Sequence, residues 1–404
     1  MRMFKTGRSS SRRLKPAAIH GHTGTPDPKS PIPGFLNPKS DSFCRIIKPV
    51  HEITNLGKLD YMHILTNRNI LIALLMLVFA VSAIVAYQAD QPSFVSPSEN
   101  WEEIINRPDV KHETFFVTTP GARLEADLFV PDGGKDSKPA VVFITGSGDA
   151  LYQNYGNGLI EAFVLDVFPP RDIAVLLVNK RGMGQSTGSW LNNNFQGRSD
   201  DIYAAVRYLQ ERDEIDKQNI GVMGHSQGGW IANLVAAQHD DVAFFISLAG
   251  PTTRVETQMQ DTYRNVFACE GSSGEDLEKR VTNQLRLTHL GAAIGRALPF
   301  GVIGFDAAII EYDPEGALRT VRQPGLFAYG EYDPFVPPLS SQNRIQELFS
   351  ADLPENLSFI TISGANHRFK VVSSFCTSPE EARTAEFSPE LVSVVAHWLD
   401  SIGY

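Results

Sequence analysis

Ser226 stands between two glycines, Gly224 and Gly228, in the stretch GVMGHSQGGW. A serine hydroxyl becomes a strong nucleophile only where a base takes its proton and a third group orients that base. The stretch follows an apolar run typical of a buried strand and opens the helical pattern WIANLVAAQ. In such a setting, small neighbours let a sharp turn hold the serine in a strained conformation. We therefore predict that Ser226 is a nucleophile; a structural glycine turn is the alternative.

An acid and a base for this serine occur further along the chain, each directly after an apolar run. Asp333 follows the run GLFAYG in the stretch EYDPFVPP, and His367 follows LSFITISG in ANHRF. Ligands and catalytic groups of open α/β sheets gather at the carboxyl ends of the strands. Ser226, Asp333 and His367 are therefore predicted to meet at one edge of a sheet. Glu331 is the alternative to Asp333 as the acid.

Backbone amides able to bind a negatively charged oxygen are predicted at two places. One is the amide of Gln227, directly after the serine, and the other belongs to the loop FITGSGDALYQN after the first core strand. In that loop we predict Ser147 as the donor, with Gly146 as the alternative, because turn geometry cannot be read from sequence. His225 neighbours the serine, but adjacent residues in a turn point apart, so we expect it to pack.

The elements that must position these residues alternate between apolar runs and helical patterns. Two β-rich stretches, residues 113–117 and 122–130, flank Pro120 and Gly121 and predict a hairpin. Runs typical of parallel strands buried on both faces follow at residues 140–146, 173–179, 219–224, 242–250, 325–330 and 357–364. Helical patterns lie at residues 159–168, 199–215, 230–238, 341–350 and 389–402, the second with Ser199 as its cap. The predicted fold class is α/β, a mostly parallel sheet with helices on both faces.

One connection is much longer than a crossover helix needs. Residues 251–323 separate two predicted strands and contain helical stretches such as GEDLEKRVTNQLRL. We predict a helical cap over the edge where ligands bind in open α/β sheets, with a decorative insertion as the alternative. Its large apolar residues either line an acyl pocket or pack the cap onto the sheet: Phe267, Leu298, Phe300 and Phe305.

The chain before the α/β region has a different composition. Residues 1–69 are rich in Pro, Ser, Gly and Lys without regular periodicity, which predicts a disordered region, and they carry 12 Lys and Arg against 4 Asp and Glu. Residues 70–87 form an uncharged run just long enough to cross a bilayer, so they are either a transmembrane anchor or a cleaved signal peptide. A buried core helix is the third option. Anchor and signal both leave the body on the non-cytoplasmic side, membrane-anchored or exported.

Charge and cysteine content narrow the classes of partner. The chain has a formal net charge of -10, and no cluster of Lys and Arg follows Asn69, which argues against nucleic acid as a partner. Cys44 would lie across the membrane from Cys269 and Cys376, which are able to pair in an oxidising compartment if they are close enough. None of the cysteines has the spacing of a metal site, and we predict neither a metal nor a cofactor.

Together, these residues resemble the α/β-hydrolase superfamily, especially its serine esterases with a dienelactone-hydrolase-like or acyl-aminopeptidase-like layout. The resemblance covers residues 112–403 and rests on VFITGSGD, NKRGMGQSTG, GHSQGG, GEYDPFVPP and GANHRF in that order. Thr145 stands where many relatives have His, so the acyl-pocket chemistry of the lipase-like branch is not implied. In NKRGMGQSTG the resemblance implies a structural role at the rim of the site for Arg181, Gly182, Gly184 and Ser186.

The residues and the resemblance predict hydrolysis of a small-molecule carboxylic ester through an acyl-enzyme intermediate, with Ser226, His367 and Asp333 as the triad. A serine peptidase or an acyltransferase would use the same residues. A non-catalytic binding protein on this fold is the alternative from another class, and loss of a triad residue would favour it. Epoxide or haloalkane hydrolysis would prefer Asp at the position of Ser226.

Overall fold

The structure is a computed structural model, and it describes residues 101–155, 158–299, 301–350 and 353–404. The predicted disordered region 1–69 and the predicted membrane segment 70–87 lie outside these residues, as does Phe300. Within the described part, no single helix has the length and apolar composition needed to cross a bilayer. One pair of helices bent by 103°, Gly274–Ala297 and Gly301–Ile309, meets that criterion by length and composition only.

An eight-stranded sheet forms the centre of the described chain, with the strand order β1-β2-β4-β3-β5-β6-β7-β8. Its first two strands are the predicted hairpin, joined at Pro120 and Gly121, and β2 also pairs with β4 antiparallel. All later neighbours pair parallel, as the continuous apolar runs predict. The strands are β1 (Val110–Thr119), β2 (Ala122–Pro131), β3 (Lys138–Ile144), β4 (Ala174–Val178), β5 (Ile215–His225), β6 (Phe245–Leu248), β7 (Gly325–Gly330) and β8 (Leu357–Ile362).

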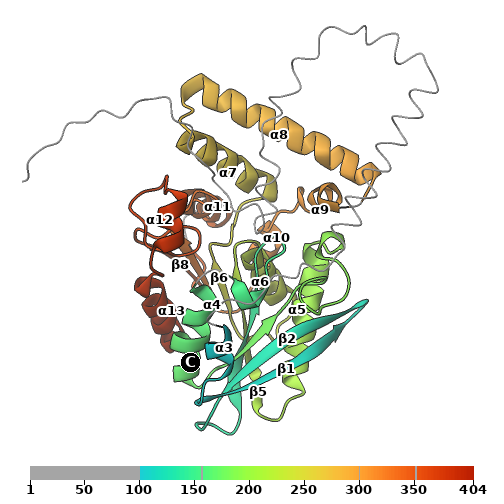
Figure 1. Ribbon diagram of the computed structural model, residues 1–404, viewed down its shortest axis with the longest axis vertical. Coiled ribbons are helices and arrows are strands. Elements are labelled where there is room, and N and C mark those ends of the chain that lie inside the picture. Colours follow the sequence, from blue (N-terminus) through green and yellow to red (C-terminus); the bar gives the residue numbers. More distant parts are fainter. Residues whose placement is uncertain (1–100, 156–157, 300, 351–352) are drawn as a thin grey trace, which may run out of the picture. The chain divides into compact units, whose positions relative to one another are not determined.

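Helices cover both faces of the sheet because successive strand residues point to opposite sides. Val142 packs into a core with helices α5 (Phe195–Gln210), α6 (Gln227–Gln238) and α11 (Pro338–Phe349). Its neighbour Val141 packs into a second core on the other face. That core contains α3 (Trp101–Ile105), α4 (Leu159–Glu161) with its π-helical continuation Ala162–Val167, and α13 (Pro389–Ser401). Figure 1 shows α4 and α13 on one side of the strands and α5 on the other.

The predicted start of α5 at Ser199 is wrong. The helix begins at Phe195, because the side chain of Asn194 accepts a hydrogen bond from the Gly197 amide and caps the first turn. Ser199 lies buried inside the helix, where its hydroxyl donates to Gln238 Oε1 over 2.9 Å.

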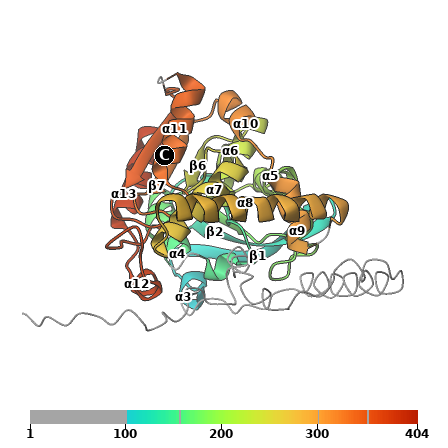
Figure 2. The ribbon, with the colours of Figure 1, turned by 90° about the horizontal axis from the view of Figure 1, so that it is seen from above.

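The described residues of the long connection between β6 and β7 form four helices: α7 (Val255–Cys269), α8 (Gly274–Ala297), α9 (Gly301–Ile309) and α10 (Glu315–Thr320). The helices α7 and α8 run side by side in both ribbon views (Figures 1 and 2). Two of the apolar residues in this insertion, Phe267 and Phe305, are buried in the core that includes α5 and α6. Packing is therefore their role in this structure, one of the two that the sequence left open.

A disulfide joins Cys269, the last residue of α7, to Cys376 in the segment after β8. The two cysteines are 107 positions apart in the chain. Their pairing answers a question that the sequence left open. It also ties the inserted helices to the part of the chain that follows His367.

Candidate active site

Ser226 occupies the turn between β5 and α6 in a backbone conformation that non-glycine residues rarely adopt, with φ of 56° and ψ of -123°. Two glycines make this turn sterically possible. A Cβ on Gly224 would collide with the carbonyl oxygen of Gly228, and a Cβ on Gly228 would collide with the carbonyl oxygen of Ile144. The strand, the tight turn and the helix thus hold the serine side chain at the carboxyl end of β5.

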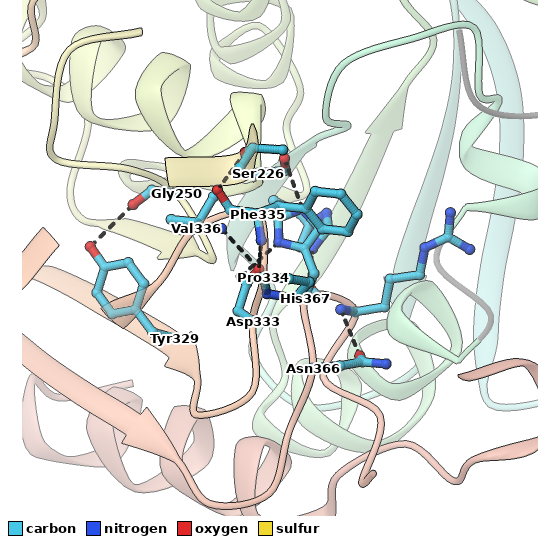
Figure 3. Close-up of polar contacts among 12 residues, drawn as sticks. Ser226, Gly250, Tyr329, Asp333, Pro334, Phe335, Val336, Asn366 and His367 are labelled. Carbon is cyan, nitrogen blue, oxygen red and sulfur yellow. Dashed lines mark hydrogen bonds and ion pairs between the residues drawn. The ribbon is translucent and has the colours of Figure 1, made fainter. Parts of the chain in front are cut away.

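The structure brings Ser226, His367 and Asp333 into one line of hydrogen bonds (Figure 3). His367 Nε2 lies 3.0 Å from Ser226 Oγ, and His367 Nδ1 lies 2.7 Å from Asp333 Oδ2. A carboxylate only accepts hydrogen bonds, so Nδ1 carries the hydrogen and Nε2 is left to accept the serine proton. This tautomer is the one that a general base for Ser226 requires.

Asp333 is fully buried, and the other oxygen of its carboxylate has partners of its own. Asp333 Oδ1 accepts hydrogen bonds from the amides of Phe335 at 2.8 Å and Val336 at 2.9 Å. Glu331, the alternative acid, is exposed and accepts a hydrogen bond from the Gly364 amide at 2.7 Å instead. The geometry therefore assigns the contact with His367 to Asp333.

The loop after β3 approaches Ser226 closely, and its two predicted amide donors differ in their partners. The Gly146 amide already donates to the Tyr155 hydroxyl at 2.7 Å. The Ser147 amide contacts no acceptor in the described part of the chain. On the opposite side, Gln227 is the first residue of α6, where a helix leaves backbone N–H groups without intrahelical partners. Ser147 and Gln227 thus retain the amides that an oxyanion would need.

Two buried basic side chains donate hydrogen bonds to the carbonyl groups of this loop. Lys180 Nζ donates to the carbonyl oxygens of Gly146, at 2.9 Å, and Gly148. Arg198 Nη2 donates to the Thr145 carbonyl at 2.7 Å, and its Nη1 donates to the side chain of Gln227. Burial lowers the pKa of Lys180 well below its usual range and that of Arg198 to about 10.

The hydrogen bond from Lys180 to the Gly146 carbonyl oxygen fixes the direction in which the Ser147 N–H points. Both groups belong to one trans peptide unit, in which C=O and N–H point opposite ways. The same rule applies to the preceding peptide, where Arg198 holds the Thr145 carbonyl and the Gly146 amide points away to Tyr155. Sequence reasoning missed Lys180, although it stands directly before Arg181 in the motif NKRGMGQSTG.

His225 does more than pack, contrary to our expectation. The ring is buried, which lowers its pKa well below the usual range, so it is neutral. Its Nε2 lies 2.8 Å from the His367 carbonyl oxygen, an acceptor, and therefore carries the hydrogen. Its Nδ1 then accepts from the Tyr155 hydroxyl at 2.7 Å, which in turn accepts from the Gly146 amide. Tyr155 and His225 thus connect the β3 loop to the loop that carries His367.

The residues of NKRGMGQSTG lie where a structural role requires. Arg181 makes an ion pair with Asp201 at 2.7 Å. Gly184 has a φ of 55°, and a Cβ there would collide with the Glu125 carboxylate. Ser186 Oγ accepts a hydrogen bond from the Glu125 amide at 2.9 Å. Across the described residues, no group of three or more His, Cys, Asp and Glu side chains is placed to hold a metal ion.

Comparisons with known proteins agree with this fold. Residues 162–290 match the model of the prolyl oligopeptidase family. The AB hydrolase superfamily protein YisY of Bacillus subtilis is 26% identical over 193 residues, which cover 43% of this chain and 69% of YisY. The esterase Pf2001 of Pyrococcus furiosus superposes with a TM-score of 0.51 at 15% identity, over 77% of this chain and 97% of the esterase. A hypothetical protein of Pseudomonas aeruginosa reaches 0.50 at 16% identity, over 76% and 99% of the two chains.

The mostly parallel sheet and the strand-turn-helix at Ser226 are those of an α/β-hydrolase, so the predicted fold class is confirmed. Together with the family match and the similarity to YisY, this fold supports the expectation from the motifs that the chain is an α/β-hydrolase superfamily serine hydrolase.

Proposed function

We propose that this hydrolase cleaves carboxylic esters through an acyl-enzyme formed on Ser226. The observation that carries the proposal is the line from Ser226 Oγ through His367 to Asp333, with distances of 3.0 and 2.7 Å. Ser226 Oγ attacks the ester carbonyl carbon while its proton passes to His367 Nε2. Asp333 stabilises the imidazolium that forms and keeps the ring in its productive orientation.

The amides of Gln227 and Ser147 bind the oxygen that becomes negative in the tetrahedral intermediate. The dipole of α6 adds to this stabilisation because the positive end of the helix lies beside Ser226. When the intermediate collapses, the alcohol leaves with the proton from His367. Water then attacks the acyl-enzyme, gives its proton to His367, and the acid is released as Ser226 recovers its hydrogen.

A serine peptidase is the second candidate, and the match of residues 162–290 to the prolyl oligopeptidase family favours it. An ester and an amide of the same acyl group would form the same acyl-enzyme on Ser226. They differ in the leaving group, since an amine must be protonated before it leaves. Comparison of matched ester and amide substrates therefore separates the two candidates.

We also propose that the hydrolase body lies on the non-cytoplasmic side of a membrane, anchored or released. The disulfide between Cys269 and Cys376 supports this location, because disulfides persist in oxidising compartments. The uncharged run of residues 70–87 behind a basic region supports it as well.

The test is hydrolysis of p-nitrophenyl esters of increasing chain length, beside the matched p-nitroanilides, by the full chain in detergent. We expect Ser226→Ala to abolish turnover and labelling by a fluorophosphonate. Ser147→Ala is the matched control: it removes a hydroxyl but keeps the backbone amide, so activity should persist. Equal ester hydrolysis by the parent and Ser226→Ala would refute the mechanism, and faster anilide turnover would select the peptidase.

A further inference from the structure

A row of apolar side chains is exposed along the second half of α8 and on α9. The exposed fractions are 56% for Leu287, 57% for Leu290, 44% for Ile294, 42% for Leu298 and 37% for Ile303. The first four are spaced by three or four residues and therefore share one face of the helix. We name these five residues the outer stripe. The opposite face of α8 is the one that packs, through Val281, Ala292 and Gly295.

The charges around the outer stripe differ from those of the chain as a whole. The chain is acidic, with a formal net charge of -10, yet no Asp or Glu occurs between Glu278 and Asp306. That interval carries four cations, Lys279, Arg280, Arg286 and Arg296. Arg286 makes no ion pair with any described residue. The acidic partner of Arg296, Glu311, is 82% exposed at a distance of 3.4 Å, so the pair is weak in water.

From this combination we propose that the outer stripe binds the surface of an anionic phospholipid bilayer. The helix α8 would lie in the plane of the headgroups, with the leucines and isoleucines between the acyl chains and Arg286, which neighbours Leu290 on the helix surface, beside the phosphates. Helices that bind membrane surfaces combine an apolar face with flanking cations in this way. The proposal concerns a surface outside the Ser226 site and goes beyond the proposed ester hydrolysis.

A second copy of the chain fits the outer stripe less well. Antiparallel contact of Leu287–Leu298 with its own copy would leave Arg286 of each chain, next to the stripe, without an acidic partner in the contact. No Asp or Glu occurs in the sequence of this interval to pair with it. A phosphate-bearing surface, in contrast, supplies an anionic partner for Arg286.

The length of the chain is compatible with this contact. Residues 88–100 separate the predicted membrane segment from Trp101, the first residue that the structure describes. Such a stretch spans at most about 45 Å when fully extended. If residues 70–87 stay in a bilayer, Trp101 therefore lies within about 45 Å of that bilayer.

The test uses the full chain with Cys44→Ser, which leaves an introduced cysteine as the only free thiol. An environment-sensitive fluorophore is attached at Leu290→Cys and, as the matched control, at Lys217→Cys on the exposed start of β5. Vesicles of phosphatidylcholine with or without phosphatidylglycerol carry a quencher in their acyl chains. We expect a blue shift and quenching at position 290 on anionic vesicles only, and water-like emission at position 217 on both.

Two further variants sharpen the result. The double variant Arg286→Gln, Arg296→Gln should need about tenfold more anionic lipid to give half of the fluorescence response at position 290, because each cation near an anionic surface contributes to binding. Lys217→Gln should leave that response unchanged, and all variants should keep the parent's activity on a soluble ester.

Three results would overturn the proposal. Water-like emission at position 290 on anionic vesicles would exclude a bilayer contact. An equal response on neutral vesicles would remove the role given to the arginines. A change that depends on protein concentration without lipid would assign the outer stripe to a second copy.

Discussion

Asp333→Asn should lower kcat for ester hydrolysis by about 10⁴, equivalent to about 5.5 kcal/mol of transition-state stabilisation. The structure dictates how the new side chain must sit. The atom of the new Asn that replaces Asp333 Oδ1 must again be an oxygen. It faces the backbone N–H groups of Phe335, at 2.8 Å, and Val336, at 2.9 Å, and only an acceptor can pair with them. The amide nitrogen of Asn then faces His367 Nδ1, at the 2.7 Å position that Oδ2 holds now.

Two N–H groups cannot face each other, so His367 must move its hydrogen to Nε2. That nitrogen then points a hydrogen at Ser226 Oγ and cannot accept the serine proton. The assay is steady-state hydrolysis of a p-nitrophenyl ester, with melting curves to show that the variant is folded. Glu331→Gln is the matched control, because Glu331 is exposed and contacts Gly364 instead; it should stay within about threefold of the parent. Near-parental kcat for Asp333→Asn, or a large loss for Glu331→Gln, would refute the assignment of the acid.

Three further changes test parts of the structure that the triad does not include. Lys180→Met should lower kcat about tenfold to a hundredfold with little change in KM, because the Ser147 amide loses its fixed direction. Lys217→Met is the control, and an unchanged kcat in Lys180→Met would contradict the role of Lys180. Tyr155→Phe should lower the free energy of unfolding by about 1–3 kcal/mol, measured by urea denaturation, because it leaves His225 Nδ1 and the Gly146 amide buried without this partner. Asp306→Asn should stabilise the protein at pH 7.5 by about 1–3 kcal/mol, because burial raises the folded pKa of Asp306 from 3.8 to about 6. The ionisation of Asp306 therefore opposes folding increasingly between these two pKa values and fully above the higher one, so urea denaturation should show the gain shrinking towards pH 4.

The sequence predicted those parts of the fold and site that depend on local pattern. The parallel strands are visible as apolar runs, and Ser226, Asp333 and His367 each stand directly after such a run. The β3 loop was visible too, through its glycines. These features need only a short window of sequence because strand ends determine where the residues meet.

Contacts between elements that are distant in the chain could not be predicted from the sequence. Tyr155 and His225 are 70 positions apart, and no local sequence pattern around either residue predicts their hydrogen bond. Arg198 reads as one of several charged residues on an amphipathic helix, yet it is buried against the Thr145 carbonyl. The pairing of Cys269 with Cys376 likewise depends on how the inserted helices pack rather than on spacing.

The attachments of α7 limit how this enzyme can admit a substrate. Asn265 and Thr262 donate hydrogen bonds to the carbonyl oxygens of Pro334 and Phe335, directly beside Asp333, both at 3.0 Å. The disulfide fixes the end of the same helix to the segment beyond His367. A rigid upward swing of all the inserted helices would therefore pull on the acid and the base together. A displacement of the inserted helices that preserves the triad must therefore leave α7 in place.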